Sequence, residues 1–318
     1  MAKTLDDFCD RIMADDHPIR RLEPEGLAAE FADYFRVPLR VSLEDLAVLL
    51  ECAGVGDVSE RPLAGGLRGI HYIQPDGTYA IHYLEGQWEG SSKLTVLHET
   101  FEIIHEQVWD RHHDCQPNRV ICPEAERFAA ATLMPREVFA AYAQAGGLDV
   151  VALQNLFQCA YSAVALRLSE VILRQPLLLA LYERRGQDDP AHWPTPTRLG
   201  DLRVTVMRRT AGMETPRSRL LNGWRGGVPR KGRALSAGSL AERAARSGGP
   251  EYDEGDGIAV AARPVLWKGR LSKVALVAVP WEHRRVLEPQ LAAVRRWPDH
   301  FSPGAVPRLA AGWVKAAP

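Results

Sequence analysis

The feature that most constrains the fold is the run LTVLHETFEIIHE, residues 94–106. At about 100° per residue, the apolar side chains of this run and of Val108 fall on one stripe of an α-helix. The stripe consists of Leu94, Leu97, Phe101, Ile104 and Val108. Histidine and glutamate side chains border it on one side. The run therefore predicts a helix, capped by Ser91 or Ser92, with one face for a core and an adjoining face rich in metal-ligating groups.

His98 and Glu102 lie one helical turn apart. A turn separates their Cα atoms by about 6 Å, which allows both side chains to reach one ion. His105 lies about 10 Å along the axis from His98, which is too far for a shared ion in a straight helix, so we expect a half-buried helix residue there; the alternative is that a local distortion of the helix makes His105 a ligand. Glu99 is placed to act as a general base on a metal-bound water. The motif H-E-x-x-E alone is weak evidence for a metal site, because histidine and glutamate are both common on solvated helix faces.

The rest of the chain predicts a mixture of helices and strands. DDFCDRIMA, GLAAEFADYF and VSLEDLAVLLECAG have helical periodicity, and Ser42 is the expected N-cap of the third helix. RGIHYIQ and TYAIHY flank an Asp-Gly turn, which is typical of a β-hairpin. PEAERFAAATLM has Pro123 in its first turn and ends before Pro135, and further helical segments extend to about residue 185. RVTVMRR, GIAVAARPVLW and SKVALVAVPW alternate like strands.

Proline and polar residues crowd together at 186–199, which predicts a linker. We therefore expect a helical extension at 1–37, a mainly helical domain with a small hairpin at 38–185, and an α+β domain at 200–318. Residues 200–318 carry 21 Lys and Arg against 10 Asp and Glu, whereas the remaining chain carries 18 against 30. An acidic front part and a basic back part indicate either attraction within the molecule or a back part that meets an acidic partner.

The second helix, PEAERFAAATLMP, resembles the segment E-A-N-x-F-A-x-x-L-L-M-P of the ImmA/IrrE family of zinc metallopeptidases. The matching residues are Glu124-Ala125, Phe128-Ala129 and Leu133-Met134-Pro135. Further blocks follow in the order of the family. SLEDLAVLLECAGV resembles its opening helix, the hairpin its strands, SSKLTVLHETFEIIHE its metal helix and FQCAYSAVALRLSEV its late helix. The resemblance covers about residues 38–175 and implies a zincin-like metallopeptidase domain.

The resemblance also implies roles for individual residues. His98 would be the first metal ligand, Glu124 the third, and Glu99 the general base. Glu102 stands at the second ligand position, where the family has histidine. A carboxylate is an acceptable zinc ligand, so one divalent ion fits the set, and the extra carboxylate shifts the preference from zinc toward Mn or Fe(II). The alternative is that the metal has been lost and the fold survives as a scaffold.

ImmA/IrrE peptidases are cytoplasmic regulators that cut a helix-turn-helix repressor, so the resemblance implies an endopeptidase in which Glu99 activates a metal-bound water. The back domain would then be sensory or regulatory. The rival interpretation is a non-catalytic regulator that uses the same fold to bind a partner protein or DNA. RSRLLNGWRGGVPRKGR, with Arg225, Arg230, Lys231 and Arg233, suits phosphate contact, although such a run is also typical of a solvated flexible loop.

The five cysteines are scattered, which indicates thiols rather than a disulfide framework in a cytoplasmic chain. His112, His113, Cys115 and Cys122 have the chemistry of a structural zinc site but lack C-x-x-C spacing, so we do not favour one. No run of 18 apolar residues exists, and MAKTLDDFCDRIMADD has acids where a signal peptide needs an apolar core, so we expect no signal peptide. We expect a cytoplasmic protein without a membrane contact.

Overall fold

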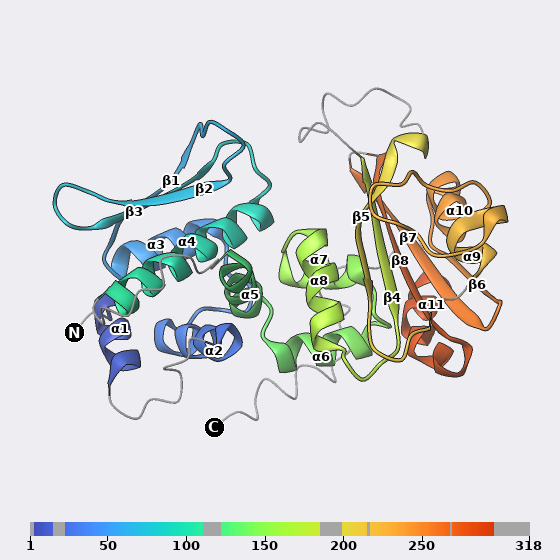
Figure 1. Cartoon of the computed structure of the whole chain (residues 1–318), viewed down its shortest axis with the longest axis horizontal. Helices are drawn as coiled ribbons and strands as arrows, with labels where there is room; N and C mark the ends of the chain where they lie inside the picture. Colours follow the sequence, from blue (N-terminus) through green and yellow to red (C-terminus); the bar gives the residue numbers. More distant parts are fainter. Residues whose placement is uncertain are drawn as a thin grey trace. The chain divides into compact units, whose positions relative to one another are not determined.

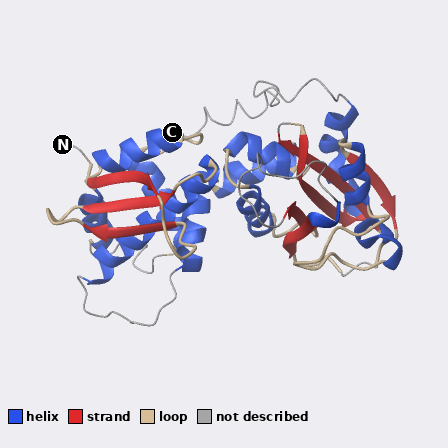
Figure 2. Cartoon of the chain, turned by 90° about the horizontal axis from the view of Figure 1, so that it is seen from above, coloured by secondary structure: helices blue, strands red, loops and turns tan. Residues whose placement is uncertain are grey.

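The computed structural model describes residues 3–14, 23–110, 122–184, 199–214, 217–267 and 269–295. Contacts between Cα atoms divide the chain into two compact units. The first comprises Met1–Pro135 and Phe157–Ala160, and the second comprises Arg136–Leu156 and Tyr161–Pro318. Each unit combines helices with a sheet (Figures 1 and 2), which confirms the predicted α+β class.

Five helices build the helical part of the first unit. They are α1 (Leu5–Met13), α2 (Pro24–Phe35), α3 (Leu43–Cys52), α4 (Glu89–Asp110) and α5 (Cys122–Leu133). Ser42 caps α3 by accepting a hydrogen bond from the backbone of Asp45, as predicted. The predicted cap of α4 at Ser91 or Ser92 is wrong, because the helix already begins at Glu89. α4 and α5 pack together through the rings of Phe101 and Phe128, whose centroids lie 5.4 Å apart.

A three-stranded sheet lies over α3 and α4 (Figures 1 and 2). Its strands are β1 (Val55–Arg61), β2 (Gly69–Ile73) and β3 (Tyr79–Leu84), in the order β1-β3-β2. β2 and β3 form the predicted hairpin, and β1 pairs parallel with β3. The pairing places His71 beside Ile81, which is fully buried, so both side chains point toward α4.

The second unit is a five-stranded antiparallel sheet with helices on both faces (Figure 1). The strands are β4 (Leu178–Arg184), β5 (Leu202–Arg209), β6 (Glu251–Gly255), β7 (Ile258–Trp267) and β8 (Arg270–Pro280), in the order β5-β4-β8-β7-β6. The α-helices are α6 (Arg136–Ala145), α7 (Val150–Phe157), α8 (Tyr161–Val171), α9 (Arg219–Asn222), α10 (Leu240–Ser247) and α11 (Glu288–Arg295). The 3₁₀ turns are η3 (Leu199–Asp201), η4 (Gly223–Arg225) and η5 (Trp281–Leu287).

The prediction that helical segments extend to about residue 185 is wrong. α8 ends at Val171, and Leu178–Arg184 is the strand β4. Pro176 prevents a helix from continuing into this run. The first five residues of β4 are buried between β5 and β8, so the run has no polar alternation to identify it as a strand.

The compact units differ from the predicted domain limits. α6 and α8 belong with the five-stranded sheet, while α1 and α2 belong with the first unit. β4 and β5, on either side of the predicted linker at 186–199, pair with each other, and residues 186–198 lie outside the described residues. The functional division at 1–37, 38–185 and 200–318 therefore stays a prediction.

The predicted thiols are confirmed at three positions, because Cys9, Cys52 and Cys159 form no disulfide. The candidate structural zinc residues at 112, 113 and 115 lie outside the described residues, and Cys122 is the first residue of α5. Over the part of the chain that is described, every helix is too short or too polar to cross a membrane.

Candidate metal centre

The site forms where β2 crosses the middle of α4, and Gly69 is what lets the two elements approach. A Cβ atom at this position would lie 2.3 Å from Cγ2 of Thr95 and 2.8 Å from Oε1 of Glu99. Such distances are shorter than any van der Waals contact, so only glycine fits here without displacing the helix. The close approach brings His71, the next position of the strand on the same side as Gly69, over the polar face of α4.

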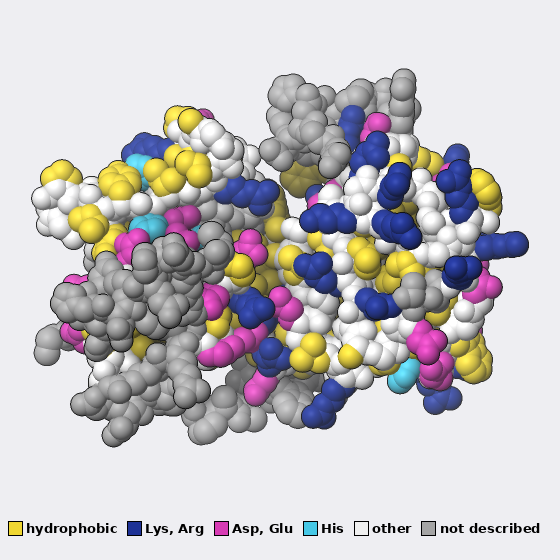
Figure 3. Space-filling model, viewed as in Figure 1, with side chains coloured by type: hydrophobic (Ala, Val, Ile, Leu, Met, Phe, Trp, Pro, Cys, Tyr) yellow, Lys and Arg dark blue, Asp and Glu magenta, His cyan; other side chains and the backbone are white. Residues whose placement is uncertain are grey.

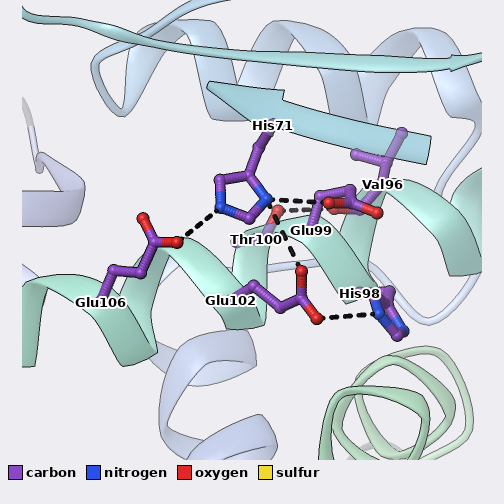
Figure 4. A network of polar contacts seen from close by, with 7 residues as sticks. All are labelled: His71, Val96, His98, Glu99, Thr100, Glu102 and Glu106. Atoms are coloured by element: carbon purple, nitrogen blue, oxygen red, sulfur yellow. Dashed lines mark hydrogen bonds and ion pairs between the residues drawn. The ribbon is translucent and has the colours of Figure 1, made fainter. Parts of the chain in front are cut away.

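His98 and Glu102 converge on one side of this face (Figure 4), as the sequence predicts. Nε2 of His98 lies 3.2 Å from Oε1 of Glu102. Two ligands bound tetrahedrally at 2.0–2.2 Å from one ion lie about 3.3–3.6 Å apart, so the observed spacing fits a shared ion after a small outward shift. Burial lowers the pKa of His98, but the hydrogen bond to Glu102 and the nearby carboxylates outweigh it and raise the pKa. The same hydrogen bond lowers the pKa of Glu102.

His71 joins three glutamates of α4 (Figure 4). Its Nδ1 lies 2.8 Å from Oε2 of Glu99 and 3.7 Å from Oε2 of Glu102, and its Nε2 lies 3.0 Å from Oε1 of Glu106. Burial lowers the pKa of His71, but the hydrogen bonds to Glu106 and Glu99 and the charges of both carboxylates raise it to about 9. With both ring nitrogens facing carboxylates, His71 is a protonated imidazolium near neutral pH.

One ligand atom each of His71, Glu99 and Glu102 lies within 4.8 Å of the others, so these three residues could hold a metal ion once the imidazolium of His71 has lost a proton. Glu102 is common to this group and to the pair with His98: one of its oxygens faces each imidazole. Glutamate at position 102 thus forms a bridge between two histidines. Nitrogen and carboxylate oxygen donors together suit a divalent ion such as zinc, Mn or Fe(II).

The other predicted site residues occupy different surroundings. Glu124 is half-buried in the first turn of α5, the helix that packs against α4. Its role as third ligand stays a prediction. His105 is half-buried, and its ring centroid lies 6.3 Å from that of Phe101, in agreement with the expected packing role. Arg225, Arg230, Lys231 and Arg233 are exposed residues of the second unit.

His71 is the site residue that was missed from the sequence. Its signal was present in the alternation of the hairpin, because His71 and Ile81 occupy paired positions that face the same side. Finding it required the pairing register together with the helix that covers that side.

Comparisons with known proteins found one matching family model and a similar solved structure. The family model Peptidase_M78, described as IrrE N-terminal-like domain, matches residues 50–169, which include both histidines and all the glutamates described above. A solved structure of a Mycobacterium tuberculosis transcriptional regulator is similar to 91% of this chain and 84% of that chain, with a TM-score of 0.51 and 14% sequence identity. At 14% sequence identity, this structural similarity shows a shared fold and no more. No curated protein matches the chain.

Proposed function

We propose that the protein is a metal-dependent endopeptidase that acts on a regulatory protein, because residues 50–169 match the family model of the IrrE N-terminal-like domain. The observation that carries the proposal is the convergence of His98 and Glu102, at 3.2 Å, beside the buried carboxylate of Glu99. These are the positions that the family motif assigns to two ligands and a base. A glutamate at the second ligand position keeps an oxygen donor directed at the same point.

His98 and Glu102 would hold one divalent ion together with Glu124 from α5, with zinc first and Mn or Fe(II) as the alternatives that the extra carboxylate favours. When bound, the ion supplies Lewis acidity toward the scissile carbonyl. Glu99 takes the proton of the attacking water, and the N–H of His71 that donates to it holds its carboxylate in one orientation. The second ring nitrogen of His71 donates to Glu106, which anchors the imidazole itself.

A helix-turn-helix repressor is the substrate that we propose. The support is the family together with a structural neighbour of both units that is named as a transcriptional regulator. Such repressors act in the cytoplasm, so the proposal includes a cytoplasmic location. The second unit would sense the condition under which cleavage is needed.

The test is cleavage of a purified helix-turn-helix protein encoded beside this chain, with and without added zinc or Mn. Glu99→Gln should leave the metal bound and abolish cleavage, because the amide cannot accept the proton. His98→Ala should abolish both, and Glu51→Gln, an exposed glutamate of α3, should change neither. Cleavage by the Glu99→Gln protein would show that the base is wrongly assigned.

A second candidate function is a non-catalytic regulator that uses this fold to bind a partner protein or DNA. One observation favours it: the His71 imidazolium already places a positive charge between Glu99 and Glu106, as a bound ion would. The carboxylates are then satisfied without a metal. Protein that stays metal-free after incubation with zinc, Mn and Fe(II), and that leaves every repressor intact, would establish this alternative and exclude the peptidase.

A further inference from the structure

The segment 217–235 of the second unit has an unusual charge distribution. Residues 217–241 contain six Arg and Lys and neither Asp nor Glu. The six, all exposed, are Arg217, Arg219, Arg225, Arg230, Lys231 and Arg233, which we call the basic surface. Within the described residues none of them forms an ion pair, whereas Arg243 and Arg246 of the following helix α10 pair with Asp253 and Glu242. Figure 3 shows Lys and Arg side chains gathered on one face of this unit.

The basic surface is folded against the sheet, and it is not a loose loop. The backbone of β5 forms hydrogen bonds with it along the edge of the sheet: Val204 donates to Arg233 at 2.9 Å, Gly232 donates to Val204 at 2.7 Å, and Leu235 donates to Leu202 at 2.9 Å. These bonds fix the segment as an additional edge. The backbone beside Lys231 and Arg233 is therefore held in place before any partner arrives, which reduces the backbone entropy lost on binding.

Trp224 stands within this segment and is 70% exposed, more than any other large hydrophobic side chain of the described residues. Glycines stand on both sides of Trp224 in the chain. Gly223 (φ 61°, ψ −151°) and Gly226 (φ 63°, ψ 178°) adopt backbone conformations that are essentially restricted to glycine. A Cβ atom on Gly223 would lie 1.7 Å from the carbonyl oxygen of Ala237. The turn η4 is thus packed tightly underneath while it presents Trp224 outward.

Arg225 lies beside this ring, with its guanidinium carbon 4.7 Å from the ring centroid. The segment thus combines an exposed indole beside a guanidinium with cations that form no ion pair within the described residues, and the carboxylate of Asp256 accepts a hydrogen bond from the backbone N–H of Arg219. The cations neutralise phosphates, and the ring offers a flat apolar face on which an unpaired base can stack. A duplex keeps its bases stacked within the helix, so they are not available to stack on the indole. The carboxylates of an acidic peptide would bind the cations but would leave the indole without a contact.

We propose that the basic surface and Trp224 form a binding site for single-stranded nucleic acid. The backbone of the strand follows the edge at β5, and one base stacks on Trp224. The site is independent of the metal centre, which lies in the other unit.

The test is fluorescence anisotropy of a labelled 20-nucleotide oligo-dT titrated with the full chain, and with the same strand in a duplex. Binding to the single strand should weaken as salt increases. Trp224→Ala should weaken it by about fivefold or more, which is the range for one stacked base. Replacement of Arg225, Arg230, Lys231 and Arg233 by alanine should lower the salt slope by up to about 3, since each phosphate contact on a single strand contributes about 0.7.

The matched control is Arg243→Ala combined with Arg246→Ala, which removes two cations that are already paired. This variant should bind as the wild type does, and circular dichroism should show that all variants are folded. Glu99→Gln should also bind as the wild type does, so a failure here is separate from a failure of the peptidase proposal. The inference is overturned if oligo-dT does not bind at low salt, if the duplex binds as tightly and Trp224→Ala has no effect, or if polyglutamate competes as well as oligo-dT.

Discussion

His71→Gln is the substitution that most directly tests the electrostatics of the candidate metal centre. In the folded protein the hydrogen bonds and charges of Glu106 and Glu99 raise the pKa of His71 to about 9, from an ordinary value of 6.5. A difference of that size between the folded and unfolded states corresponds to about 3 kcal/mol of stability, at 1.36 kcal/mol per pH unit. The side chain is only 12% exposed, so screening by solvent removes little of it.

The direction of the pH dependence follows from the direction of the pKa shift of His71. Because the folded pKa is above the unfolded one, the charge of His71 stabilises the protein fully below pH 6.5, and the contribution is lost as pH rises through about 9. Glutamine keeps a hydrogen-bond donor and removes the charge. His71→Gln should therefore lower the free energy of unfolding by about 3 kcal/mol at pH 6, and by much less at pH 9.5.

The assay is urea unfolding of chelator-treated protein at both pH values, followed by circular dichroism. His82→Gln, at an outward-facing position of the same sheet, is the matched histidine control. A loss that is equal at pH 6 and pH 9.5 would mean that the role of His71 is only steric. A loss that grows with pH would contradict the assignment of His71 as a cation held by carboxylates.

Three further substitutions have expected outcomes for stability, all measured by urea unfolding. Asp149→Ala should destabilise the second unit by about 3–5 kcal/mol, because it leaves the buried guanidinium of Arg263 without its carboxylate, and Asp149→Leu combined with Arg263→Met should restore most of the loss. Gly223→Ala should destabilise the second unit by more than about 1 kcal/mol, because the added Cβ would lie 1.7 Å from the carbonyl oxygen of Ala237. An unchanged free energy of unfolding would show that this turn is not tightly packed. Phe128→Ala should remove about 3–5 kcal/mol from the first unit, where the ring is fully buried.

Where local rules determine structure, the sequence was sufficient to predict it. The helices α4 and α5 have strong apolar periodicity, and the Asp-Gly turn specifies the hairpin of β2 and β3. β1 was missed because its sequence, VGDVSER, has few apolar residues and gains its strand structure from pairing with β3. β4 was read as helix because a fully buried strand has the same apolar composition as a buried helix.

The candidate site likewise has residues that the sequence predicts and one that it does not. His98, Glu99 and Glu102 are neighbours on one helix, so their spacing alone predicts that they face the same region. His71 comes from a strand and reaches Glu99 only because Gly69 permits the strand to lie against α4. Contacts between elements distant in sequence depend on register and on close backbone approach, and no local pattern encodes either.

Metal stoichiometry shows whether Glu102 and His98 hold an ion together. The full chain is stripped with a chelator, dialysed against zinc, Mn or Fe(II), and analysed by inductively coupled plasma mass spectrometry. We expect close to one ion per chain for the wild type and for Glu51→Gln, and a loss of that ion in His98→Ala and in Glu102→Ala. Wild-type protein that takes up none of the three metals, or a His98→Ala protein that keeps its ion, would contradict this expectation.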